Sequence, residues 1–142
     1  MDYRQLAFYQ KSQEVVRGVS RITPGLQRTL QGREISRQLF RAAISVGANI
    51  AEGHGRHMGQ EYVHYLTIAQ GSANEVDHWL HTALDCEIGD PEVLKSLIAL
   101  NNETRKMLVT TLGTLRKQLR GSAIREPHIP YSPIPRIEEG SE

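Results

Sequence analysis

Apolar residues recur every three or four positions over four long stretches of the chain, which is the period of an amphipathic helix. The two clearest stretches carry Ile35, Leu39, Ala42, Ala43, Val46 and Ile50, and then Tyr62, Leu66, Ala69, Ala73, Val76, Leu80 and Ala83. Gly53, Gly55 and Gly59 lie between them and readily take the backbone conformation that ends a helix. We therefore expect two antiparallel helices joined at a glycine-rich corner.

Breaker residues set the limits of four predicted helices, at residues 3–21, 33–53, 58–87 and 91–120. Thr23-Pro24-Gly25 is expected to stop the first helix, because proline disfavours helical backbone in the residue before it and glycine turns the chain. Leu26 and Leu30 then belong to a long connection, as anchors over one end of the core. In Gly89-Asp90-Pro91, we expect the glycine to follow the end of the third helix. Asp90 is then the N-cap and Pro91 the first residue of the fourth helix.

Small and polar residues interrupt two of these predicted helices. Gly71, Ser72 and Ala73 lie in the middle of residues 58–87. A mid-helix glycine costs roughly 1 kcal/mol relative to alanine, so we expect a neighbouring helix to approach closely there. Asn101 and Thr104 interrupt the apolar face of residues 91–120, where we expect local hydrogen bonds.

Four helices without a strand pattern predict an all-α fold, an antiparallel up-down four-helix bundle. We assign residues 1–120 to the bundle domain and residues 121–142, which contain four prolines, to a flexible Pro-rich tail whose PxxP spacing permits polyproline II. No apolar run matches a bilayer span and the N-terminus lacks a signal-peptide core, so we expect a cytoplasmic protein and no membrane. The single cysteine, Cys86, excludes an internal disulfide and is expected to be buried.

Charge is unevenly distributed, although the net charge is only +1. Residues 1–60 carry +5, residues 61–99 carry −6 and residues 100–120 carry +4. Opposite charges on successive helices favour antiparallel packing, and a basic surface also suits an acidic partner.

Two groups of basic residues are candidates for contact with nucleic-acid phosphates. They are Arg33, Arg37 and Arg41 on the second predicted helix, and Arg105, Lys106, Arg116, Lys117 and Arg120 on the fourth. Few aromatic residues lie among them, so base stacking is not indicated. The alternative is a solvated charged face without a ligand.

Apolar residues outside the core stripes are candidates for contacts between subunits. Ile44 and Ala48 follow the arginines on the outer face of the second predicted helix. Ile68 and Trp79 lie on one flank of the third. An interface and a solvated face with scattered apolar residues are both compatible with this pattern.

Two Glu-x-x-His pairs, Glu61 with His64 and Glu75 with His78, have the spacing used by di-iron bundles. Those centres take one pair from each of two helices, whereas both pairs here lie on one helix and away from its core stripe. We therefore expect no metal site, no cofactor and no catalytic residue, although a metal-dependent enzyme is one of the hypotheses to test.

His54 and His57 flank the glycine-rich corner, but the corner lacks the three or four converging ligands of a zinc site. We expect Glu52 and Arg56 to brace the turn through hydrogen bonds instead.

The second and third predicted helices resemble the family of bacterial bundle proteins encoded within intervening sequences of 23S rRNA genes. The matching residues are Gln38-Leu39-x-Arg41-Ala42-Ala43-x-Ser45-Val46, Asn49-Ile50-Ala51-Glu52-Gly53-x-Gly55-Arg56 and Glu61-Tyr62-x-x-Tyr65-Leu66-x-Ile68-Ala69-x-Gly71-Ser72-x-x-Glu75-Val76. Of these, Asn49, Glu52, Gly53, Gly55 and Arg56 form the most specific block. The first and fourth helices match by pattern only.

This resemblance implies a homopentameric ring without known catalysis. The chain is also similar to accessory proteins of diversity-generating retroelements, which implies a reverse transcriptase and RNA or DNA as partners. The first hypothesis is therefore a non-enzymatic homo-oligomer that binds RNA or a nucleoprotein through basic helix faces. The second is a scaffold that docks a protein, such as a reverse transcriptase, without its own RNA affinity.

Overall fold

Four long helices make up almost all of the structure, a computed structural model that describes residues 2–56 and 59–121. A short 3-10 helix, η1 (Tyr3–Gln5), precedes the four helices. They are α1 (Ala7–Leu26), α2 (Leu30–Gly55), α3 (Gln60–Asp85) and α4 (Pro91–Gly121). Gly121, the first residue of the predicted tail, is the last residue of α4, and the rest of the tail, residues 122–142, lies outside the described residues.

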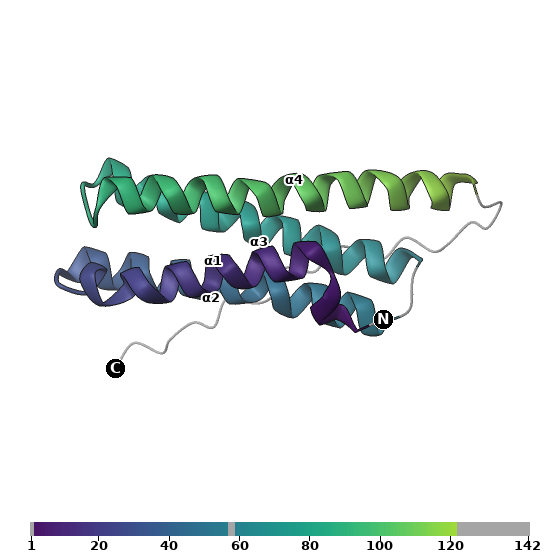
Figure 1. Cartoon of the computed structure of the whole chain (residues 1–142), viewed down its shortest axis with the longest axis horizontal. Coiled ribbons are helices and arrows are strands. Elements are labelled where there is room, and N and C mark those ends of the chain that lie inside the picture. Colours follow the sequence, from purple (N-terminus) through teal and green to yellow (C-terminus); the bar gives the residue numbers. More distant parts are fainter. Residues whose placement is uncertain (1, 57–58, 122–142) are drawn as a thin grey trace, which may run out of the picture.

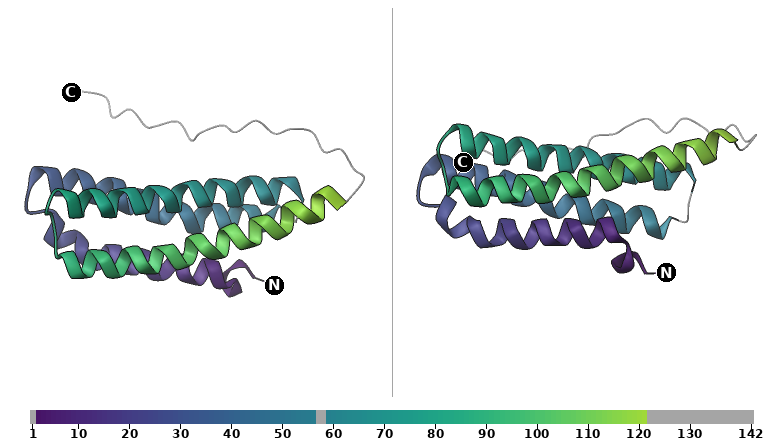
Figure 2. Two further views of the ribbon diagram at one scale, coloured as in Figure 1. Left: turned by 90° about the horizontal axis from the view of Figure 1, so that it is seen from above. Right: turned by 45° about the horizontal axis from the view of Figure 1, so that its top comes forward.

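The helices run alternately up and down, so each is antiparallel to the next in sequence (Figure 1). Each packs against two neighbours, in the order α1, α2, α3, α4 and back to α1, and within the described chain no Cα atom of α2 lies within 8 Å of one of the diagonal helix α4. The views in Figure 2 agree, with α3 beside α2 and α4 beside α1. The predicted all-α, antiparallel up-down four-helix bundle is confirmed. Among the described residues, none of the four helices contains an apolar stretch of the length that a membrane span requires.

The apolar stripes that the sequence predicts form the core. The predicted core residues of α2 and α3 are all buried, and Leu39, Ile50, Leu66 and Leu80 have no exposed surface. One cluster of buried residues joins the halves of the helices near the α1–α2 turn, and a second fills the other half. Burying such side chains contributes roughly 1.5–3 kcal/mol each, which makes this core the main source of stability.

Helix α1 differs from the prediction at both ends. At its start, Leu6 is extended and separates η1 from α1. At its end, α1 continues through Pro24 to Leu26, whereas the sequence predicts a stop at Thr23-Pro24-Gly25. Proline in the last turn removes only one backbone hydrogen bond. The Thr23 hydroxyl donates to the Val19 carbonyl at 2.9 Å, and Leu26 is 1% exposed, so burial of Leu26 holds the last turn in place.

The α1–α2 connection is therefore short, and α2 begins at Leu30 rather than at residue 33. Thr29 caps α2, its hydroxyl accepting from the Gly32 N–H at 3.0 Å. Leu30 is 71% exposed, so the prediction that it anchors the end of the core is wrong. The cap aligns the first turn of α2 so that Gly32 faces α1 while Leu30 points outward.

Polar residues within the bundle tie α3 to α2 and α4. Asn101 is 1% exposed and its side-chain amide donates to the Ala73 carbonyl at 2.9 Å, as the sequence predicts for this interruption. The Ser45 and Ser72 hydroxyls are hydrogen-bonded at 2.8 Å. Thr104 differs, because its buried hydroxyl has no hydrogen-bond partner among the described residues.

The prediction that a neighbouring helix approaches closely is wrong for Gly71. An added Cβ at this position would meet nothing within 4 Å, because Gly71 lies on the outer side of α3. Ala73, two residues later, is the small residue that faces the core and has no exposed surface. The close contact of α3 with α4 therefore lies at Ala73.

The α3–α4 turn follows the sequence prediction closely. Gly89 has a positive φ of 89°, Pro91 begins α4, and the Asp90 carboxylate accepts from the Glu92 N–H at 2.9 Å. Cys86 is exposed, which corrects the prediction that it is buried. It follows Ala83, the last buried residue of α3, and so lies beyond the core.

Candidate nucleic-acid interface

The arginines of α2 lie on its outer side. Arg33, Arg37 and Arg41 are all exposed, whereas Ile35 and Leu39 between them are buried. Their four-residue spacing corresponds to a rise of about 6 Å per step along the helix. A row of guanidinium groups at this spacing presents forked hydrogen-bond donors to several phosphates at once.

Three further exposed arginines lie on α1 and the α1–α2 turn. Arg17, Arg21 and Arg28 are exposed and belong to the half of α1, and the turn, that lie beside the first half of α2 (Figure 1). Residues 15–51 contain six arginines and one acidic residue, Glu34. We call these six arginines the basic face: Arg17, Arg21, Arg28, Arg33, Arg37 and Arg41. Arg17, Arg21 and Arg28 are not among the residues predicted from the sequence, although the near-absence of acidic residues around them was a signal that could have found them.

Two of the predicted α4 residues have side-chain contacts with α3. Arg105 Nε donates to Asn74 Oδ1 at 2.9 Å, and its Nη1 lies 3.4 Å from Asp77 Oδ2. Arg116 Nη2 donates to Thr67 Oγ1 at 3.3 Å. These guanidinium groups tie α4 to α3, so a phosphate would have to compete with contacts within the bundle.

The remaining α4 residues, Lys106, Lys117 and Arg120, are exposed. Lys117 and Arg120 lie near the end of α4 that is far from the α1–α2 turn (Figure 1). Because α4 lies diagonally across the bundle from α2, the structure does not bring the two predicted basic groups together on one subunit. They form two separate patches.

The most specific block of the family resemblance packs α2 against α3. An added Cβ at Gly53 would lie 2.8 Å from Tyr65 Cβ, so glycine permits the close contact of the two helices. The Asn49 amide donates to the Ser45 carbonyl at 2.8 Å. An added Cβ at Gly55, in contrast, would meet nothing within 4 Å.

Glu52 and Arg56 brace the corner, as predicted. Arg56 donates to Glu52 Oε1 from Nε at 3.1 Å and from Nη2 at 2.9 Å, and this hydrogen bonding raises the pKa of Arg56 above its ordinary value. The Arg56 guanidinium also lies 5.8 Å from the centre of the Tyr65 ring. His54 lies edge-on to Tyr62, and His57 lies outside the described residues. The contacts of this block within the described residues therefore stabilise the corner between α2 and α3.

The two Glu-x-x-His pairs lie on the outer side of α3. Glu61, Glu75 and His78 are exposed and His64 is half-buried. Glu75 accepts a hydrogen bond from the Trp79 indole at 3.2 Å. Nowhere in residues 2–56 and 59–121 do three or more His, Cys, Asp or Glu side chains converge in a way that would hold a metal ion.

The predicted subunit-contact residues have different environments. Ile44 is 44% exposed and Ala48 is exposed on the outer side of α2. Phe40, which was not among the predicted contact residues, is 38% exposed on the same helix. Ile68 is half-buried, and Trp79 packs partly against the core cluster. Phe40 and Ile44 therefore expose apolar surface on α2 beside the arginines, and α4 exposes two further apolar side chains, Val93 and Val109.

Comparisons with known proteins place this bundle among its relatives. The model of the family described as 23S rRNA-intervening sequence protein matches residues 4–110. A crystal structure from Bacteroides thetaiotaomicron, described as a protein with unknown function from the S23 ribosomal protein family, superposes with a TM-score of 0.69 at 25% sequence identity. The match covers 75% of this chain and 98% of that one. No curated protein matches the chain.

Proposed function

The chain belongs to the 23S rRNA-intervening sequence protein family, and we propose that it is a non-enzymatic, cytoplasmic accessory protein that assembles with itself and binds RNA or a nucleoprotein. The observation that carries this proposal is the basic face, six exposed arginines in a stretch with one acidic residue. Arginine binds phosphate by paired hydrogen bonds and stays charged at all physiological pH values.

Charge segregation directs a polyanion to one side of the bundle. Residues 61–99, which span α3 and the start of α4, carry a net charge of −6. A nucleic acid is repelled from that side and attracted to the α1–α2 side, where each phosphate contact releases counterions. Because few aromatic side chains lie on this face, the contacts would be with the backbone of the nucleic acid and carry little base specificity.

Self-assembly is supported by the apolar surface beside the arginines. Phe40 and Ile44 are one helical turn apart and each exposes more than a third of its surface. A second copy of the chain is a partner that would cover them, and the resemblance to the family implies a homopentamer. In such a ring the basic faces of several subunits would bind one RNA together, which raises affinity without new contacts.

The same exposed apolar residues favour one alternative, a scaffold that docks a protein such as a reverse transcriptase. Its interface would be Phe40 and Ile44 rather than the arginines, and it would have no RNA affinity of its own. Exposed apolar patches of this kind mark protein contacts as readily as subunit contacts.

Light scattering distinguishes the two functions. We expect the purified protein to assemble, to about 80 kDa if five subunits of 16.0 kDa form the ring. Added 23S rRNA fragments should increase the mass of the particle at low salt, and high salt should release them, because counterion release weakens with salt. A stable assembly that keeps the same mass when RNA is added would favour the scaffold. A protein that stays monomeric at all concentrations would exclude self-assembly.

A further inference from the structure

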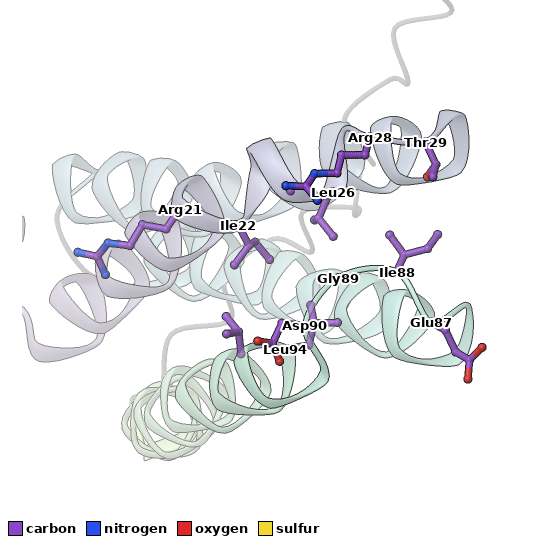
Figure 3. A pocket seen from close by; sticks show the side chains of 12 residues that line it. Arg21, Ile22, Leu26, Arg28, Thr29, Glu87, Ile88, Gly89, Asp90 and Leu94 are labelled. Atoms are coloured by element: carbon purple, nitrogen blue, oxygen red, sulfur yellow. The ribbon is translucent and has the colours of Figure 1, made fainter.

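A groove opens at the end of the bundle where the α1–α2 and α3–α4 turns meet (Figure 3). Its volume is about 480 Å³, within the range of sites that hold small ligands or short peptide segments. Apolar side chains from the end of α1, the α3–α4 turn and the start of α4 line it: Ile22, Leu26, Ile88, Val93 and Leu94. Leu26 and Leu94 form the buried base of the groove, whereas Val93 is exposed and Ile22 and Ile88 are half-buried, so these three side chains offer open apolar surface at this end of the bundle.

The two rims of the groove carry opposite charges. Arg21 and Arg28 lie on the α1–α2 rim, and Glu87 and Asp90 lie on the α3–α4 rim (Figure 3). Neither guanidinium forms an ion pair or hydrogen bond with residues 2–56 or 59–121. An apolar floor between one basic and one acidic rim fits an extended segment with apolar residues on one side and a charge of each sign on its flanks.

We propose that residues 134–138 of the same chain occupy this groove. They read Ile134-Pro135-Arg136-Ile137-Glu138 and lie outside the described residues. A polyproline II helix has three residues per turn, so residues three apart lie on the same side. In this conformation Ile134 and Ile137 would both face the floor of the groove, about 9 Å apart. Arg136 and Glu138 then lie on opposite flanks, where Arg136 meets the acidic rim and Glu138 meets the basic rim.

The length of the chain after α4 matches the distance to the groove. Gly121 ends α4 at the far end of the bundle, and Leu94 in the groove is 27 residues earlier on the same helix. At a rise of 1.5 Å per helical residue the return path is about 40 Å. A proline-type chain rises 3.1 Å per residue, so the 13 residues from Gly121 to Ile134 span about 40 Å.

The native cysteine provides a direct test in the full-length chain. Cys86 is exposed and immediately precedes Glu87 on the acidic rim. Glu139, three residues after Arg136, shares its flank in the proposed register, so a Glu139→Cys variant should place a second thiol beside Cys86. Under mild oxidation we expect an intramolecular disulfide between Cys86 and the new cysteine, detected by mass spectrometry. It should form at least about tenfold faster than in a chain whose tail is attached to the bundle but not bound in the groove.

Charge reversal gives the matched control, because the thiols and the tether stay the same. Adding Arg28→Glu to Glu139→Cys should remove the tenfold gain, and adding Glu138→Arg to that variant should restore it. Arg28 is exposed and belongs to no core cluster, so the reversal leaves the bundle folded. Equal rates with and without Arg28→Glu, or disulfides between subunits only, would overturn the proposal. It does not depend on RNA binding.

Discussion

Replacing the three arginines of α2 together, by Arg33→Gln, Arg37→Gln and Arg41→Gln, should lower the affinity for an rRNA fragment by about 100-fold or more at low salt. Each arginine that neutralises one phosphate releases about one counterion, so three lost contacts reduce both the affinity and its salt dependence. Fluorescence anisotropy of a labelled fragment measures both quantities. All three side chains are exposed, so the fold should be unchanged.

A variant with the same change in charge provides the control. Lys106→Gln, Lys117→Gln and Arg120→Gln also remove three positive charges, but from the exposed residues of α4, diagonally across the bundle from α2. We expect this variant to lose less than about tenfold in affinity, because only long-range attraction changes. Equal losses in the two variants would show that net charge, rather than the basic face, governs binding. Dissociation of the assembly by the α2 variant would instead place these arginines between subunits.

Gly32→Ala should destabilise the bundle by about 2–4 kcal/mol, the largest effect expected of any single methyl group. An added Cβ at residue 32 would overlap the Leu26 carbonyl oxygen, a backbone atom in the last turn of α1 that cannot rotate away. It would also approach the Thr29 hydroxyl that caps α2, at 3.0 Å. The free energy of unfolding, measured by urea titration with circular dichroism, gives the loss.

Gly71→Ala is the matched control, the same substitution in the middle of a helix. Nothing lies within 4 Å of an added Cβ at this position, so the higher helix propensity of alanine should stabilise the protein by up to about 1 kcal/mol. Opposite signs for the two variants would support the close contact of α1 and α2 at Gly32. A Gly32→Ala variant as stable as the native protein would contradict it.

The helical period predicts the bundle because burial of one face is what holds each helix in place. Leu39, Leu66 and Leu80 are buried where the pattern puts them. Pro24 shows where a local signal fails, because the burial of Leu26 outweighs one lost hydrogen bond. The same limit applies at Gly71, whose environment depends on how α3 is rotated rather than on its neighbours in sequence.

The candidate interface is only partly readable from the sequence. The four-residue spacing of Arg33, Arg37 and Arg41 is enough to place them on one side of a helix. The contacts of Arg105 with Asn74 and Asp77 depend on the register of α4 against α3, which periodicity does not specify. Likewise, the arginines of α1 join the basic face only because α1 and α2 are neighbours joined by a short turn.

The salt dependence of RNA binding by the native protein shows whether the basic face binds phosphates. Anisotropy titrations of a 23S rRNA fragment at increasing salt give the slope of log affinity against log salt concentration. Six arginines on phosphates predict a slope of about −4 per subunit in contact with RNA. A slope near zero, or no binding at the lowest salt concentration, would contradict a nucleic-acid function for the basic face.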